Sequence, residues 1–199
     1  MKFFVNFLTA FRIAASFAII ATMFSGWYLT TFVLFILAAL TDFFDGFLAR
    51  KYNVCSKLGG VMDHIGDKLL VVNTFILLCI WVRSPYVIVP IIFMIARELY
   101  VSGLREFLGT QKIEMPVPKK RFSMGKIKTT LQMISICAFL LWFVMGSFVS
   151  VTSGSKFMFY AIYTLPSIGI FGLWFSLVAS IWSAAEYTKD FLGKIKKIK

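Results

Sequence analysis

Residues 11–40 read FRIAASFAIIATMFSGWYLTTFVLFILAAL, and Arg12 is the single charged residue in this stretch. A helix needs roughly 20 apolar residues to cross the hydrocarbon core of a bilayer, so residues 11–40 predict two membrane spans. Residues 69–96 contain one further charge, and residues 131–155 contain none. The whole chain is 59% hydrophobic and 15% charged, whereas soluble domains usually carry about 25% charged residues. These features predict an all-α, polytopic membrane protein and disfavour a soluble globular domain.

Turn residues and polar loops divide the chain of 199 residues into about six transmembrane helices. No internal repeat or low-complexity segment separates one part from another, so we expect a single domain, residues 1–199. The expected spans are Leu8–Phe24, Leu29–Ala49, Gly59–Trp81, Val87–Phe107, Gly125–Met145 and Phe157–Tyr187.

The basic residues lie in loops and near the C-terminal end, and their positions indicate the orientation of the chain. The formal net charge is +12, and the cations cluster in residues 50–57, 105–128 and 189–199. Cations beside membrane helices follow the positive-inside rule and attract anionic lipid headgroups, so this distribution does not favour binding of nucleic acid. With an even number of spans, these loops and both termini share one side. We therefore predict an integral protein of a bacterial inner membrane, with both termini cytoplasmic.

Four aspartates, Asp42, Asp45, Asp63 and Asp67, lie within or beside apolar segments. A carboxylate at membrane depth costs about 2.5–3.5 kcal/mol on insertion scales, so it normally lines a polar cavity. Asp42 and Asp45 share one face of a helix, and Asp63 and Asp67 share one face of the next. The short connection makes these helices antiparallel neighbours. Because clustered carboxylates repel each other, we expect one or two divalent ions, Mg²⁺ or Mn²⁺, to hold them together.

Other interpretations of the four aspartates account for less of the pattern. A structural ion-pair network would need more cations nearby than the sequence supplies. An ion-coupled transporter would spread its acids through the membrane depth and show inverted repeats. A purely structural subunit would leave the acids unexplained. The small residues beside the aspartates allow either close helix packing or ligand contact; they are Gly46, Ala49, Gly59 and Gly60.

Together these residues form the pattern Asp42-x2-Asp45-Gly46-x2-Ala49-Arg50-x8-Gly59-x3-Asp63-x3-Asp67. This pattern resembles the complete signature of the CDP-alcohol phosphatidyltransferase family. Residues 6–12 resemble the family's amphipathic entry into its first helix. Residues 96–106 and 125–129 resemble in particular the phosphatidylglycerophosphate synthase branch of that family. The resemblance therefore covers most of the chain and is weakest in the last third.

The resemblance implies a six-helix fold, often a homodimer, whose active site opens to the cytoplasmic leaflet. It implies that Asp42, Asp45, Asp63 and Asp67 hold the divalent ions and that Asp67 is also the general base for the acceptor hydroxyl. The residues that it implies for binding CDP-diacylglycerol are Asn6, Thr9, Gly46, Arg50 and Ser56.

Two positions depart from the family pattern. The family usually has proline after the third aspartate and alanine before the fourth, where this chain has His64 and Gly66. His64 is either a further metal or phosphate contact or a polar residue at a helix interface. Neither change removes a metal ligand, so we still expect activity.

Arginines and lysines of the fourth and fifth spans indicate the acceptor. Arg97 lies inside an apolar span, Arg105 follows eight residues later on nearly the same face, and Lys126 and Lys128 open the next span. Cations at membrane depth suit an anionic ligand, so we predict that Arg97, Arg105 and Lys126 bind the phosphate of sn-glycerol 3-phosphate. Snorkelling of these side chains to lipid headgroups is the structural alternative.

We therefore predict transfer of the phosphatidyl group of CDP-diacylglycerol to glycerol 3-phosphate, giving phosphatidylglycerophosphate and CMP at the edge of the lipid bilayer. Another acceptor within the same family, such as inositol phosphate, serine or phosphatidylglycerol, remains open. Neutral or zwitterionic acceptors would not need such a basic pocket.

Overall fold

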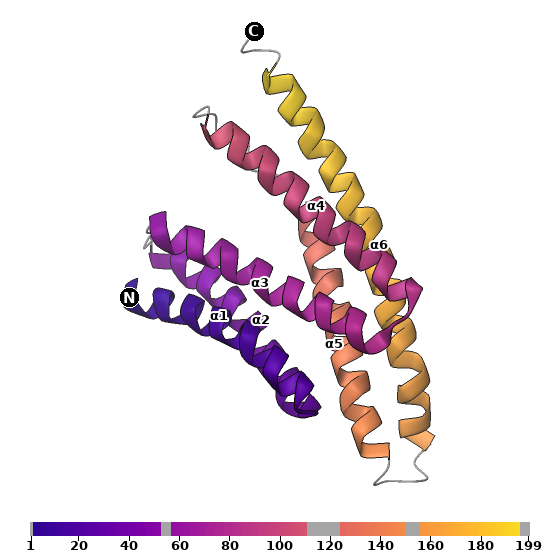
Figure 1. Cartoon of the computed structure of the whole chain (residues 1–199). Coiled ribbons are helices and arrows are strands. Elements are labelled where there is room, and N and C mark those ends of the chain that lie inside the picture. The colour runs from indigo at the N-terminus through magenta and orange to yellow at the C-terminus, as the bar shows by residue number, and fades with distance from the viewer. Residues whose placement is uncertain (1, 53–56, 111–123, 150–155, 196–199) are drawn as a thin grey trace. The chain divides into compact units, whose positions relative to one another are not determined.

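The computed structural model describes residues 2–52, 57–110, 124–149 and 156–195, and these residues are helical apart from two short turns (Figure 1). No strand occurs within these ranges. The helices are α1 (Lys2–Phe24), α2 (Tyr28–Tyr52), α3 (Lys57–Val82), α4 (Pro85–Thr110), α5 (Met124–Val149) and α6 (Lys156–Ile195). Each predicted span falls inside one of these helices, so the all-α prediction is confirmed.

Five of the helices are long and apolar enough to cross a membrane, and in α2 the described apolar part is the shorter stretch Tyr28–Thr41. Many large apolar side chains are exposed on the helices, among them Phe24, Phe171 and Phe175. A water-soluble protein rarely exposes contiguous apolar surface of this kind, whereas a lipid-facing surface requires it. The chain is therefore an integral membrane protein with about six spans, as the sequence predicts.

The chain separates into two compact units, which we describe individually. The first unit consists of Met1–Arg83 and Ile136–Gly169, and the second of Ser84–Ser135 and Ile170–Lys199. Helices α1, α2 and α3 belong to the first unit and α4 to the second, while α5 and α6 contribute to both.

In the first unit, α1 packs against α2 and α3. The turn between α1 and α2 contains Gly26 at a φ of 75°, a conformation that glycine adopts without strain. Thr31 donates a hydrogen bond to Thr22 across this turn (2.8 Å). The rings of Phe24 and Trp81 are 4.6 Å apart at the corresponding ends of α1 and α3, which run parallel. Buried apolar residues of this unit include Ile19, Met23, Phe35, Phe75, Leu78 and Phe139.

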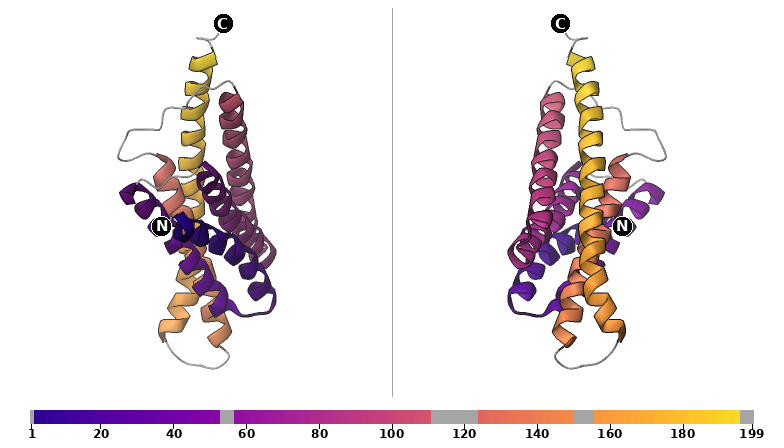
Figure 2. Two further views of the ribbon diagram at one scale, coloured as in Figure 1. Left: turned by 90° about the vertical axis from the view of Figure 1, so that its left-hand side faces the viewer. Right: turned by 90° about the vertical axis from the view of Figure 1, so that its right-hand side faces the viewer.

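In the second unit, α4 and α6 lie side by side and run parallel (Figures 1 and 2). Trp174 on α6 donates its indole N–H to the carbonyl of Tyr86 on α4 (3.1 Å). Further along both helices, the rings of Phe107 and Phe191 are 5.8 Å apart. Helix α5 packs closely on α6, because a Cβ atom at Gly172 would collide with the hydroxyl of Ser135. Buried apolar residues of this unit include Val87, Ile91, Met94, Leu173 and Leu177.

Candidate functional site

The predicted metal-binding aspartates lie on two helices of the first unit that contact each other. Helix α2 carries Asp42 and Asp45, and α3 carries Asp63 and Asp67. The side chains of the first three lie outside the described residues. Among the side chains that are described, no group of three His, Cys, Asp or Glu residues forms a metal site. Because three of the four aspartate side chains are not among these, the metal site stays a prediction.

The residues predicted to bind CDP-diacylglycerol are only partly described. Asn6 and Thr9 lie on α1, and Gly46 and Arg50 lie on α2. The Thr9 side chain is buried. The side chains of Asn6 and Arg50, and the whole of Ser56, lie outside the described residues. The role of this set therefore also stays a prediction.

Asp67, the fourth aspartate and the predicted general base, is described, and it forms an ion pair with Arg12. The distance between Asp67 Oδ1 and Arg12 Nη1 is 3.1 Å, and the pair joins α3 to α1 across 55 residues of sequence. Arg12 is fully buried, whereas the Asp67 side chain remains substantially exposed. A buried guanidinium needs an anionic partner, so this contact fixes one oxygen of the Asp67 carboxylate. Asp67 is thereby held in place while part of it stays accessible.

Sequence reasoning missed the pairing of Arg12 with Asp67. It placed Arg12 in the segment 6–12 that resembles the family, without a partner. One signal was present: Arg12 is the single charge among residues 11–40. An arginine at that depth normally pairs with a carboxylate, and the aspartates are the acids that α2 and α3 supply.

The glycine that departs from the family pattern lies directly against Arg12. A Cβ atom at Gly66 would approach Arg12 Cδ to 3.6 Å and Ile13 Cγ1 to 3.5 Å. These are ordinary van der Waals distances, so the usual alanine would fit here without displacing Arg12. The side chain of His64 lies outside the described residues.

Arg97, the first of the predicted acceptor-binding residues, joins α4 to α6 in the second unit. Its Nε donates to the carbonyl of Ser180 (3.1 Å) and its Nη2 to the hydroxyl of Ser183 (2.9 Å). Its Nη1 donates to Glu98 Oε1 (3.1 Å). The guanidinium is therefore held by α6 along one edge and by the neighbouring carboxylate at the remaining nitrogen.

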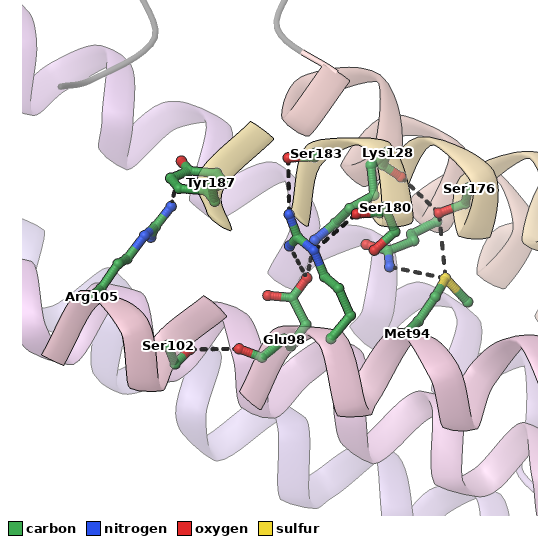
Figure 3. Close-up of polar contacts among 11 residues, drawn as sticks. Met94, Glu98, Ser102, Arg105, Lys128, Ser176, Ser180, Ser183 and Tyr187 are labelled. Carbon is green, nitrogen blue, oxygen red and sulfur yellow. Dashed lines mark hydrogen bonds and ion pairs between the residues drawn. The ribbon is translucent and has the colours of Figure 1, made fainter. Parts of the chain in front are cut away.

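Lys128 on α5 reaches the same carboxylate oxygen. Its Nζ forms an ion pair with Glu98 Oε1, and both cations are nearly buried (Figure 3). The backbone carbonyl of Lys128 accepts a hydrogen bond from Ser176 on α6 (3.2 Å). Glu98 thus joins α4 to α5, and α6 contacts both of its cationic partners. The side chain of Lys126, the lysine predicted for the acceptor site, lies outside the described residues.

Arg105 contacts α6 one turn beyond Arg97's partners. Its Nη2 donates to the hydroxyl of Tyr187 (2.7 Å), and its guanidinium carbon lies 5.0 Å from the centre of the Tyr187 ring. Arg97 and Arg105 therefore both face α6, as their spacing predicts. Sequence reasoning missed the α6 partners Ser180, Ser183 and Tyr187. Their spacing of three and four residues, which places them on one helix face, was the signal available.

Comparison with known proteins identifies the family. The profile of the CDP-alcohol phosphatidyltransferase family matches residues 3–182. Three curated relatives bear the name CDP-diacylglycerol–glycerol-3-phosphate 3-phosphatidyltransferase. The protein of Rickettsia bellii is 37% identical over 92% of both chains. That of Rickettsia felis is 36% identical over 79% of this chain and 76% of its own length. That of Cereibacter sphaeroides is 40% identical over 68% of this chain and 62% of its own length. The chain belongs to the CDP-alcohol phosphatidyltransferase family.

Proposed function

We propose that this chain transfers the phosphatidyl group of CDP-diacylglycerol to sn-glycerol 3-phosphate, forming phosphatidylglycerophosphate and releasing CMP. The observation that carries the proposal is the 37% identity with the Rickettsia bellii protein of that name, which extends over 92% of both chains. The described cations of the second unit support the same acceptor, because a phosphate ester needs positively charged donors. A single domain, residues 1–199, agrees with a family match that extends over residues 3–182.

In the first unit, Asp42, Asp45, Asp63 and Asp67 would hold one or two Mg²⁺ or Mn²⁺ ions. The donor set fits these ions, because hard divalent cations prefer carboxylate oxygens, and Asp67 keeps part of its side chain exposed. The ions would neutralise the diphosphate of CDP-diacylglycerol. Five residues of α1, α2 and the following loop would bind the nucleotide and diphosphate: Asn6, Thr9, Gly46, Arg50 and Ser56.

Asp67 would act as general base on the acceptor. It takes the proton from the acceptor hydroxyl, whose oxygen forms a bond to the lipid-side phosphorus as the bond to CMP breaks. The ion pair with Arg12 keeps the carboxylate in a fixed orientation for this step. A fixed carboxylate favours the reaction because proton transfer requires the base and the acceptor hydroxyl to be close and correctly oriented.

Arg97, Arg105 and Lys126 of the second unit would bind the phosphate of the acceptor, and Lys128 joins them. Arg97 and Lys128 meet at Glu98, and Arg105 is exposed one turn further along the α4–α6 contact. Two arginines and a lysine suit a dianionic phosphate ester. Serine carries no phosphate, so an enzyme that used it would have no need of this cluster. Inositol phosphate and phosphatidylglycerol remain the anionic alternatives within the family.

We also infer the placement and assembly of the protein. The basic segments 50–57, 105–128 and 189–199 favour a bacterial inner membrane with the termini and active site on the cytoplasmic side. A homodimer follows from the resemblance to the family.

The test is a panel of acceptors on purified enzyme with CDP-diacylglycerol and Mg²⁺ or Mn²⁺, in which CMP release is measured. Glycerol 3-phosphate should be preferred over serine, inositol phosphate and phosphatidylglycerol. Asp67→Asn should lower turnover by about 10²- to 10⁴-fold, the usual contribution of a general base. Asp190→Asn, an exposed aspartate of α6, is the matched control and should leave turnover unchanged. Preference for another acceptor would overturn the proposed substrate, and substantial turnover by Asp67→Asn would overturn the proposed base.

A further inference from the structure

The carboxylate of Glu98 occupies an unusual position in the second unit. Two cations from different helices, Arg97 on α4 and Lys128 on α5, converge on the same oxygen, Oε1 (Figure 3). The other oxygen of Glu98 accepts no hydrogen bond from any residue that the structure describes. One carboxylate oxygen is therefore shared by two cations.

Exposure distinguishes the carboxylate from its partners. The side chain of Glu98 is 28% exposed, whereas those of Arg97 and Lys128 are 10% and 6% exposed. Among Arg97, Glu98 and Lys128, the most accessible side chain is thus the Glu98 carboxylate. A ligand that approaches these two cations from solvent meets the Glu98 carboxylate first.

The remaining hydrogen bonds of Arg97 limit how a ligand could bind to it. Helix α6 already receives hydrogen bonds from Nε and Nη2, through the backbone of Ser180 and the hydroxyl of Ser183. Nη1 is the nitrogen whose partner is a partly exposed side chain. An incoming anionic oxygen would therefore use Arg97 Nη1 and Lys128 Nζ, which are the two donors that now hold Glu98.

We propose that the Glu98 carboxylate is an internal substitute for the phosphate of the acceptor. It neutralises Arg97 Nη1 and Lys128 Nζ while the site is empty, and it gives both donors up to a phosphate oxygen when the acceptor binds. Loss of the carboxylate that two nearly buried cations share would destabilise the fold, which explains why an acid is placed here. The cost of displacing the carboxylate reduces the apparent affinity for the acceptor. This inference rests on the proposed function, because it takes a phosphate ester as the ligand.

The first experiment compares wild type with Glu98→Gln, which keeps the shape of the side chain and removes its charge. The KM for glycerol 3-phosphate should fall by about fivefold or more, at the low end of the usual coupling between two binding events. Glu106→Gln removes the same charge from an exposed position of the same helix and should leave KM unchanged. An unchanged or increased KM in Glu98→Gln would overturn the proposal, because a carboxylate that only positions the two cations gives that result.

The second experiment measures binding without turnover, by thermal unfolding of the purified chain in detergent. Without phosphate, Glu98→Gln should unfold at a lower temperature than wild type, since Arg97 and Lys128 lose the carboxylate that they share. Inorganic phosphate or glycerol 3-phosphate should raise the midpoint more in Glu98→Gln than in wild type or Glu106→Gln. Glycerol should have no effect. Equal shifts in all three proteins, or a shift only with phosphatidylglycerol in the micelles, would contradict a site for a soluble phosphate ester.

The two experiments separate failure of this inference from failure of the proposed function. If wild type releases no CMP with glycerol 3-phosphate, the proposed reaction fails, while the thermal comparison still reports on Glu98. If Glu98→Gln is recovered in folded form only when phosphate is present during extraction, the inference is supported. If it is recovered under neither condition, Glu98 is a structural counter-ion and the inference is wrong.

Discussion

Each unit contains an ion pair within its apolar helices, but the two pairs differ in which charge is exposed. In the first unit, the enclosed charge is a cation: Arg12 is 0% exposed and pairs with Asp67, whose side chain is 41% exposed. In the second, an acid lies among cations: Glu98 is the exposed member and its partners are nearly buried. In each unit the carboxylate is thus the more exposed partner. Arg12 is completely enclosed, whereas Glu98, which two cations share, is accessible.

This difference suggests that Arg12 and Glu98 have different functions. A fully buried Arg12 cannot exchange with a ligand, so it can only fix the carboxylate that it contacts. A partly exposed Glu98 can leave its partners when a stronger anion arrives. We therefore expect changes at Arg12 to affect folding strongly and changes at Glu98 to affect ligand affinity.

The largest expected effect tests the fixed role of Arg12. Replacement by glutamine removes the charge and leaves Asp67 without this ion pair, and loss of one partner of a buried pair typically costs about 3–5 kcal/mol. Denaturant unfolding in detergent should detect this loss. Arg83→Gln, at an exposed arginine in the α3–α4 turn, should change stability by no more than about 0.5 kcal/mol. Equal stability of Arg12→Gln and wild type would show that the buried ion pair between Arg12 and Asp67 does not hold the first unit together.

A smaller effect is expected for Arg97, whose loss affects ligand binding and helix contact together. Arg97→Ala removes the hydrogen bonds to Ser180, Ser183 and Glu98. A hydrogen bond from the Arg97 guanidinium to the acceptor phosphate would contribute about 1.5–3 kcal/mol, so its loss should raise the KM for glycerol 3-phosphate by about tenfold or more. Ser183→Ala removes a single acceptor from Arg97 and should have a milder effect. A KM that does not change in Arg97→Ala would exclude Arg97 from the acceptor site.

The smallest expected effects compare packing at one glycine from each unit. Gly172→Ala should destabilise the second unit by about 1–3 kcal/mol, because the new methyl group displaces the Ser135 hydroxyl from its position. Gly66→Ala should stabilise the first unit by about 0.5–1 kcal/mol, since its methyl group has room beside Arg12 and alanine favours helix. Thermal unfolding of both variants provides the measurement. Effects of the same sign would show that the space beside Arg12 is not as open as its distances indicate.

The six helices and the family pattern could be predicted because both are read from the order and spacing of residues along the chain. Long apolar runs determine where helices lie, and spacing within one helix determines which residues share a face. The common orientation of Arg97 and Arg105 toward α6 followed from such spacing. Contacts between helices could not be predicted in this way. Nothing in the local sequence connects Arg12 to Asp67 across 55 residues, or Arg97 to Ser183. Those pairs depend on which helices become neighbours, and the spacing rules used for the sequence do not contain that information.

The length of α6 has a consequence for how a water-soluble substrate gains access. Its 40 residues extend about 60 Å at 1.5 Å per residue, whereas the hydrocarbon core is about 30 Å thick and an average tilt is only about 20°. Much of α6 must therefore stand in water or in the headgroup layer. Between Lys156 at its first position and Glu186, α6 carries no charged residue, so Ser183 and Tyr187 lie near the level at which the helix leaves the lipid tails. A small hydrophilic metabolite could thus reach their arginine partners directly from the aqueous phase, without entering the hydrocarbon core.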